Sequence, residues 1–182
     1  MILGAGVGWM VEEFNFLNAP YRERGARTDE YLRAMKSLWT EEEPHFQGRY
    51  VQFSALRCEP KPVQKPHPPI WIGGHSEAAL RRTGTLADGW YGHVLWRTPD
   101  ALPREIQTIR RFAEQAGRDP HTLTYAAPAY ERTFEDVLRS LPRYEQAGLN
   151  HVVLAFFMWT NEFAEVLPLM ERFAREVGLH PH

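Results

Sequence analysis

The chain has 182 residues, enough for one domain with a sizeable core but short of the roughly 250 of a closed eight-unit α/β barrel. Its 21 Lys and Arg residues against 23 Asp and Glu residues give a formal net charge of -2, which argues against nucleic acid as a partner. No apolar run reaches the ~20 residues that cross a bilayer, so we expect no membrane contact, and the single cysteine, Cys58, excludes an internal disulfide and favours a cytoplasmic location.

The first part of the chain predicts a strand, a loop and a long helix. Residues 1–7 form an apolar run before a glycine turn, and a loop is expected over 21–25. Thr28 is a suitable N-cap, so we expect a helix to begin there. Its helically spaced apolar positions are expected to face a sheet: Tyr31, Leu32, Met35, Leu38 and Trp39.

Residues 41–69 interrupt this order and are expected to form an insertion. The alternation over 45–53, around a glycine, predicts a small hairpin, and the prolines over 60–69 predict an extended connector without a helix. We interpret the connector as a stiff surface spacer, with a docking site for a proline-binding partner as the alternative. His45 and His67 lie in these two segments and are expected to be solvated.

The remaining chain predicts four further strands, each followed by a helix. The strands are expected at 70–72, 88–93, 123–127 and 151–156. The helices are expected after Ser76, from Thr98 to Gly117, over 134–147 and over 161–177. In the first of these helices the inward positions are expected to be Ala78, Ala79, Leu80 and Leu86. The five strand–helix units predict one parallel sheet.

The turn Gly73-Gly74-His75-Ser76 carries the strongest chemical signal. Two glycines allow a ligand to approach the backbone, and a helix N-terminus presents unpaired N–H groups. The turn is therefore a candidate phosphate cradle, in which Ser76 either caps the helix or donates its hydroxyl. The alternative is an ordinary tight turn, because Glu77 adds a negative charge and the spacing matches neither common nucleotide motif.

Other chemically interesting side chains give weaker signals. The histidine spacing fits no metal motif, so no metal is expected, and Cys58 is interpreted as a half-buried loop residue rather than a nucleophile. His75 follows a strand and either contacts a ligand or is a polar rim residue, and His93 is a weaker candidate for the same place. The strand tryptophans either offer a surface to a ring or belong to the core: Trp71, Trp90 and Trp96.

Several motifs together resemble the bacterial luciferase-like flavin or deazaflavin oxidoreductases. They are Gly6-Val7-Gly8-Trp9 with Glu12-Glu13-Phe14, residues 23–30 (ERGARTDE), 46–50 (FQGRY), 60–64 (PKPVQ), 68–74 (PPIWIGG) and 87–90 (ADGW). They occur in the order and register of that family across nearly the whole chain. No single motif is specific, but the combination is. The subgroup that it resembles most uses the deazaflavin coenzyme F420, and the FMN-dependent members share these motifs.

The resemblance implies a partial TIM (β/α)8 barrel in which a single domain, residues 1–182, supplies strands four to eight and lacks its N-terminal third. It implies F420 or FMN as coenzyme, with Val7 and Gly8 along the coenzyme and Gly73, Gly74, His75 and Ser76 around its phosphate. Catalytic residues stay unassigned. Some relatives carry a glutamate where this chain has Trp9, and Glu12 and Glu13 either take that part or serve as solvated partners of a helix dipole.

Two functional hypotheses follow. The first is an oxidoreductase that moves hydride between the coenzyme and a small organic substrate. The second is a catalytically incomplete half-barrel that acts in assembly or is a remnant. A five-strand sheet cut from a barrel has two open edges and an uncovered apolar face, so we also expect a homo-oligomer, most simply a dimer.

Overall fold

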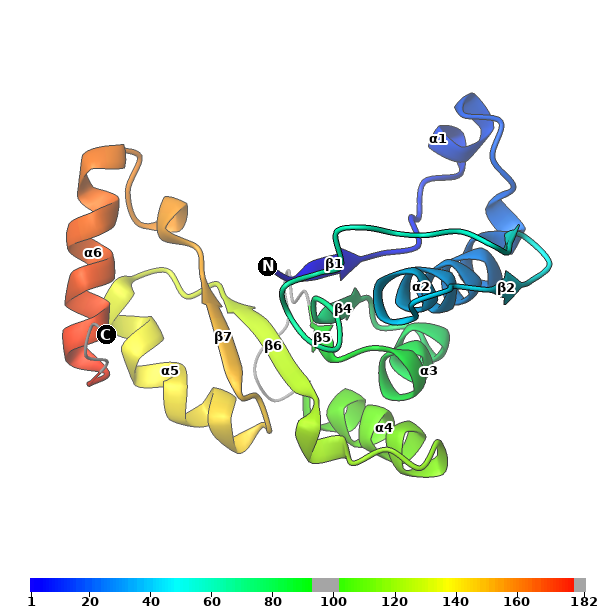
Figure 1. Ribbon diagram of the computed structural model, residues 1–182. Helices are drawn as coiled ribbons and strands as arrows, with labels where there is room; N and C mark the ends of the chain where they lie inside the picture. Colours follow the sequence, from blue (N-terminus) through cyan, green and yellow to red (C-terminus); the bar gives the residue numbers. More distant parts are fainter. Residues whose placement is uncertain (93–101, 179–182) are drawn as a thin grey trace. The chain divides into compact units, whose positions relative to one another are not determined.

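The computed structural model describes residues 1–92 and 102–178 and shows a mixed α/β fold (Figure 1). Its five-stranded parallel sheet has the order β1-β4-β5-β6-β7. The strands are β1 (Leu3–Ala5), β4 (Ile70–Gly73), β5 (Gly89–Tyr91), β6 (Thr124–Ala129) and β7 (His151–Leu154). All five strands lie where the apolar runs predict them, so the strand–helix alternation is confirmed.

The chain divides into two compact units. The first comprises Met1–Trp90 and Thr108–Leu123, and the second comprises Tyr91–Gln107 and Thr124–His182. The helix α4 (Leu102–Gln115) contributes residues to both units. The predicted helix start at Thr98, together with His93 and Trp96, lies outside the described residues. Within the described part of the chain, no helix is long and apolar enough to cross a membrane.

The core of the first unit lies between two strands and two helices. Helices α2 (Arg24–Thr40) and α3 (Glu77–Leu86) pack on β1 and β4 through a buried cluster of Leu32, Ile70, Ile72, Ala79 and Ala87. Met35 and Trp39 pack against this cluster, as the helical spacing predicts. Because β4 alternates, its residues 70 and 72 face the helices and residues 71 and 73 face away from them.

Two details of these helices differ from the sequence prediction. Helix α2 begins at Arg24 rather than after Thr28, because the 3-10 turn η1 (Tyr21–Glu23) runs directly into it. The Thr28 hydroxyl donates to the Arg24 carbonyl at 2.8 Å, which is the bond of a threonine inside a helix, not of a cap. Tyr31 and Ala78 are exposed and do not face the sheet, because on each helix the neighbouring residue, Leu32 or Ala79, is the one buried in the cluster.

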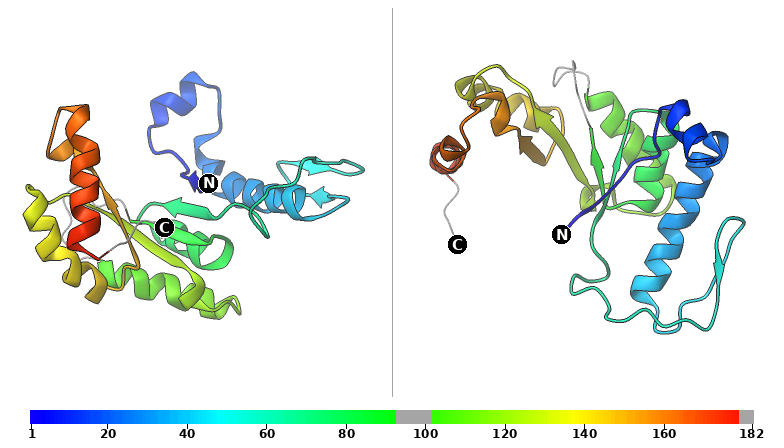
Figure 2. Two further views of the ribbon diagram at one scale, coloured as in Figure 1. Left: turned by 60° about the vertical axis from the view of Figure 1, so that its left-hand side comes forward. Right: turned by 90° about the horizontal axis from the view of Figure 1, so that it is seen from above.

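The segment between α2 and β4 contains the predicted hairpin, β2 (Phe46–Gln47) paired antiparallel with β3 (Gln52–Phe53). The Glu30 carboxylate on α2 accepts the backbone N–H groups of Arg49, Tyr50 and Val51 at 2.6 to 3.0 Å, which holds the hairpin beside α2 (Figure 2). Cys58 is half-buried in the following loop.

The connector after the hairpin contains no helix, as predicted, but its histidine was placed wrongly. His67 is buried: its Nδ1 lies 2.9 Å from the Pro68 carbonyl, and its ring lies 6.1 Å from that of Trp39. The connector is therefore packed at its end, and of the two histidines at 45 and 67 only His45 is exposed. Composition predicted a solvated ring because proline-rich segments are polar on average, whereas the burial depends on α2.

In the second unit, α5 (Phe134–Gln146) and α6 (Phe163–Glu176) follow β6 and β7. The Phe134 ring packs edge-on against Trp159 and Phe173, with centroids 5.8 and 6.1 Å apart. Arg172 lies over the same ring and pairs with Glu135 at 2.8 Å. Phe156 belongs to the 3-10 turn η4 (Phe156–Met158) rather than to the end of β7, so the predicted strand was two residues too long.

Candidate functional site

The predicted site residues gather at the carboxyl ends of β1 and β4. These strands pair in parallel with Ala5 opposite Ile72, so the segment that follows β1, with Val7 and Gly8, starts beside residues 73–76, which run from the last residue of β4 to the cap of α3. The fold thus brings together two segments that are more than 60 residues apart in the sequence. Ligand sites of parallel α/β sheets lie at this edge.

The sheet face that points away from α2 and α3 is open beside these segments. Gly4 lies opposite Trp71 in the strand register, and Gly73 follows at the end of β4. A Cβ atom added at Gly4 or at Gly73 would have no neighbouring heavy atom within 4 Å. Trp71 is half-exposed on this face. The two strands therefore present a floor of backbone and one indole on which a flat group has room.

The glycine turn after β4 is fixed by a buried tryptophan. Gly74 has φ +109°, a conformation that favours glycine, and its carbonyl accepts the Trp90 indole N–H at 2.9 Å. Trp90 is fully buried, so it belongs to the core and positions the turn from behind. The half-buried His75 ring packs edge-on against the Trp90 ring, with centroids 5.6 Å apart. This position is compatible with both predictions for His75, a ligand contact and a polar residue at the rim.

Ser76 is the N-cap of α3. Its Oγ accepts the Ala79 N–H at 3.2 Å, which satisfies one of the N–H groups that lack an acceptor within the helix. The capping alternative for Ser76 is thus the one that the structure shows. The first amides of the helix carry partial positive charge and suit a phosphate, while the exposed Glu77 carboxylate opposes one.

The segment after β1 is held by two side chains that sequence reasoning missed. Gly8 has φ +76°, and a Cβ atom there would lie 2.7 Å from the Phe14 ring. Arg24 Nε donates to the Gly8 carbonyl at 3.3 Å, and the Tyr21 hydroxyl donates to the Trp9 carbonyl at 3.2 Å. No local pattern reveals these bonds, because they join residues 12 and 16 positions apart.

Beyond this segment, the short helix α1 (Val11–Phe16) carries two carboxylates in its first turn. Glu12 and Glu13 are exposed and line a concavity of about 500 Å³ with Phe16 and Leu17. Among the residues that the structure describes, neither carboxylate has a contact that would mark it as a proton-transfer group. Among the described residues, no group of three or more His, Cys, Asp or Glu side chains is placed to hold a metal ion.

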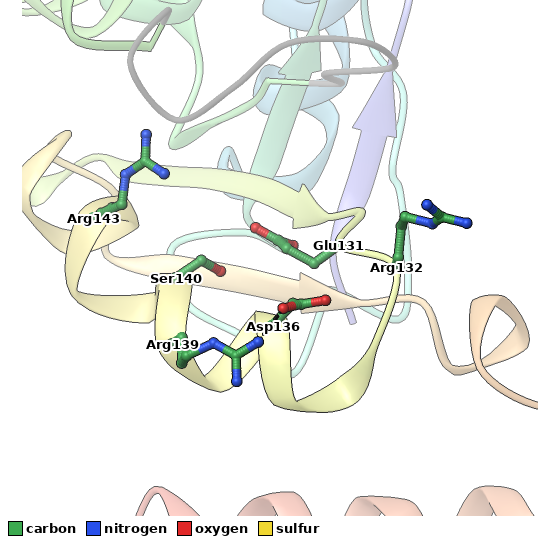
Figure 3. A pocket seen from close by; sticks show the side chains of 6 residues that line it. All are labelled: Glu131, Arg132, Asp136, Arg139, Ser140 and Arg143. Atoms are coloured by element: carbon green, nitrogen blue, oxygen red, sulfur yellow. Dashed lines mark hydrogen bonds and ion pairs between the residues drawn. The ribbon is translucent and has the colours of Figure 1, made fainter.

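A second concavity, of about 320 Å³, lies in the second unit (Figure 3). It is lined by Glu131, Arg132, Asp136, Arg139, Ser140 and Arg143. Arg139 pairs with Asp136, and the guanidinium groups of Arg132 and Arg143 point in different directions. Because its positive groups do not converge, this concavity is a weaker candidate for an anionic ligand than the edge of β1 and β4.

Comparison with known proteins decides the family. The family model described as luciferase-like monooxygenase matches residues 1–176. The chain belongs to the luciferase-like monooxygenase family. The resemblance seen in the motifs is thereby confirmed, and an oxidoreductase of the monooxygenase type is the class of protein that the family denotes.

Two curated relatives illustrate how the chain matches this family. An uncharacterised protein of Mycobacterium tuberculosis is 38% identical over 177 residues, which are 97% of this chain and 59% of that protein. The FMNH2-dependent dimethylsulfone monooxygenase of Pseudomonas putida is 38% identical over 113 residues, 60% of this chain and 31% of that enzyme. The matched segments make up 31 to 59% of the length of these curated relatives, so the chain spans only part of them.

Solved structures of luciferase-like enzymes share the fold. An F420-dependent secondary alcohol dehydrogenase in complex with an F420–acetone adduct superposes with a TM-score of 0.71 at 17% identity, over 92% of this chain and 69% of that one. A coenzyme F420-dependent tetrahydromethanopterin reductase from Methanopyrus kandleri gives 0.59 at 17% identity, over 100% of this chain and 58% of that one. The expectation of a partial TIM barrel is confirmed, because the chain matches part of these barrels.

Proposed function

We propose that this luciferase-like chain binds a flavin-type coenzyme, F420 or FMN, at the carboxyl ends of β1 and β4 and serves hydride transfer to or from a small organic substrate. The observation that carries the proposal is the open space at Gly73, where an added Cβ atom meets nothing within 4 Å, directly before the capped N-terminus of α3. Relatives named as F420- and FMNH2-dependent support both coenzymes.

The residues present fit such a coenzyme. Its phosphate would lie at Gly73, Gly74 and the first amides of α3, with Ser76 keeping the helix end ordered through its bond to Ala79. Its ring would lie along Val7 and Gly8. When bound, the coenzyme supplies the two-electron hydride chemistry, so the protein needs no redox-active side chain of its own.

The protein's own part is anchoring and orientation. The indole N–H of Trp90 fixes the Gly74 carbonyl, so the amides that follow keep one direction. Arg24 and Tyr21 fix the carbonyls of Gly8 and Trp9, so the opposite segment is equally rigid. Two rigid backbone segments lose little conformational entropy when they bind a ligand. Such a site also favours one orientation of a planar ring.

The test is an equilibrium titration of the 182-residue chain with FMN and, separately, with F420, followed by the fluorescence of the coenzyme. We expect micromolar binding of one of them and a loss of at least about tenfold in the variant Gly73→Leu, whose side chain fills the open space without a change of backbone conformation. The control is Gly117→Asn, because Gly117 also has open space around it but lies at the end of α4. Its neighbour Arg118 binds the carboxyl end of α3, whereas the candidate site is at the N-terminus of α3.

No binding of either coenzyme at near-millimolar protein would overturn the proposal. That result would favour the second hypothesis, a catalytically incomplete half-barrel in assembly. Exposed apolar side chains on one face of α6 favour this alternative: Phe163 is 90% exposed, Leu167 61% and Met170 48%.

We also propose that the chain forms a homodimer. The mass of the chain in dilute solution tests this proposal, because a well-folded monomer would exclude the dimer.

A further inference from the structure

The side of helix α1 that is turned away from Gly8 carries a concavity of about 500 Å³. Four residues line it, and their spacing places them on one side of the helix: Glu12, Glu13, Phe16 and Leu17. Phe14 points to another side, where its ring covers Gly8 and packs edge-on against Tyr21 with centroids 5.2 Å apart. The Ala19 N–H also donates to the Phe14 carbonyl at 2.8 Å. The contacts that fix α1 therefore leave this surface, the α1 concavity, open.

The α1 concavity is both apolar and acidic. Phe16 is 91% exposed and Leu17 73%, and the two carboxylates beside them are exposed as well. Among the residues that the structure describes, neither Glu12 nor Glu13 forms an ion pair. Burial of apolar side chains is favourable, and two carboxylates attract a cation at short range. The surface that fits this concavity is therefore apolar and basic.

The proline-rich connector of the same chain presents this combination. Val63 is 96% exposed, and Lys65, two residues further on, is exposed as well. The neighbouring Lys61 is occupied within the chain, because its Nζ donates to the carbonyls of Leu38 and Glu41 at 2.9 and 2.6 Å. Lys65 has no ion pair within the described part of the chain. Val63 and Lys65 together form an apolar and basic surface, the connector patch.

Both surfaces lie in the first unit, so every copy of the chain carries an acidic and a basic apolar surface. Two copies related by a two-fold axis make the same contact twice, because each copy offers its α1 concavity and its connector patch to the other. A small apolar molecule would cover only one of the two surfaces. A second copy covers both and neutralises charge at each contact, which favours the second copy as the occupant.

We propose that two copies of this chain form a closed dimer in which the α1 concavity of each copy receives Val63 and Lys65 of the other. The inference rests on the homodimer under the proposed function, because it identifies the surfaces through which the two copies meet. The competing interface is the exposed apolar face of α6, and the experiment separates the two.

The experiment reverses the charges on each surface and measures the dimer dissociation constant of the full chain by sedimentation equilibrium. One variant combines Glu12→Lys with Glu13→Lys, and the other is Lys65→Glu. Each variant alone should dimerise at least about tenfold more weakly, because like charges then meet at both contacts. An equimolar mixture of the two variants should recover the parent affinity to within about threefold. In the mixed dimer one contact has both signs reversed and the other is that of the parent.

Matched controls locate the interface. Glu42→Lys with Glu43→Lys reverses two other exposed carboxylates and should leave the dimer unchanged. Phe16→Ser should weaken the dimer at least about tenfold, whereas Phe163→Ser should leave it unchanged. Phe163 lies on α6 and is 90% exposed, so both serine variants lose an exposed ring and neither loses core. The circular dichroism of every variant should match that of the parent chain.

Three results would overturn the proposal. They are reversed variants that dimerise as tightly as the parent, a mixture of the two that stays monomeric, and a dimer that is lost in Phe163→Ser but not in Phe16→Ser, which would assign the interface to α6. A monomeric parent chain would refute the homodimer together with this interface. The readout needs neither coenzyme nor activity, so failure of the coenzyme titration counts against coenzyme binding alone.

Discussion

Replacing Gly84 by alanine tests the close approach of α3 and α4 in the first unit. A Cβ atom at Gly84 would lie 2.7 Å from the Ile109 carbonyl oxygen, 2.8 Å from the Ala113 nitrogen and 2.8 Å from the Phe112 Cβ. Two of these neighbours are backbone atoms of a helix and cannot rotate away. Alanine at this position therefore forces the helices apart.

The expected magnitude follows from two opposing effects. One extra methyl group against atoms that cannot yield costs up to about 3 kcal/mol. The better helix propensity of alanine returns about 1 kcal/mol, which leaves a net loss of about 2 kcal/mol in the free energy of unfolding. For a chain of this size the melting temperature should fall by roughly 4 to 8 °C.

The assay is urea unfolding followed by far-UV circular dichroism, with thermal melting as the second measurement. The control is Gly25→Ala in α2, where the nearest atom to the new Cβ is a nitrogen of the Arg82 guanidinium at 3.3 Å, which has to give by only a few tenths of an ångström. The control should lose no stability and gain up to about 1 kcal/mol. If Gly84→Ala were as stable as Gly25→Ala, α3 and α4 would not be in the contact described.

Three further outcomes are expected. Leu32→Ala removes a fully buried side chain and should cost about 2 to 5 kcal/mol in urea unfolding, whereas Leu17→Ala, at a 73% exposed position, should stay within about 0.5 kcal/mol; similar losses would refute the assigned core. Asp29→Ala leaves the buried Arg82 guanidinium without its ion pair and should cost about 1.5 to 3 kcal/mol by the same assay; an unchanged midpoint would show that the pair does not stabilise the helices. Desolvation opposes ionisation of Glu30, but three backbone N–H bonds outweigh it and hold the pKa of Glu30 below the usual 4.5. Docking of the hairpin on α2 should therefore persist at pH values above 4.5 and weaken as the pH falls below 4.5. Amide NMR signals of residues 49–51 that titrate above pH 4.5 would contradict this.

Local patterns in the sequence determined the elements and the class of fold. Each of the five apolar runs became a strand because buried strands need continuous apolar surface. The amphipathic segments became helices because helical spacing gathers their apolar residues on one face. Ser76 was predictable as a cap because capping joins residues three positions apart. The hairpin at residues 46–53 was predictable because alternation is a property of neighbours. The family was readable because its motifs are themselves short.

The tertiary structure decided what depends on residues far apart in the chain. The burial of His67 depends on Trp39, and the fixed carbonyls of Gly8 and Trp9 depend on side chains of η1 and α2. Helix α2 begins at Arg24 and not at the good capping residue, because η1 continues into it and the gain from one cap is small beside the packing of a 17-residue helix. The glycines that leave room at the candidate site can be identified in the sequence. Only the parallel pairing of β1 with β4 brings their segments together, because register is a long-range property that no local pattern contains.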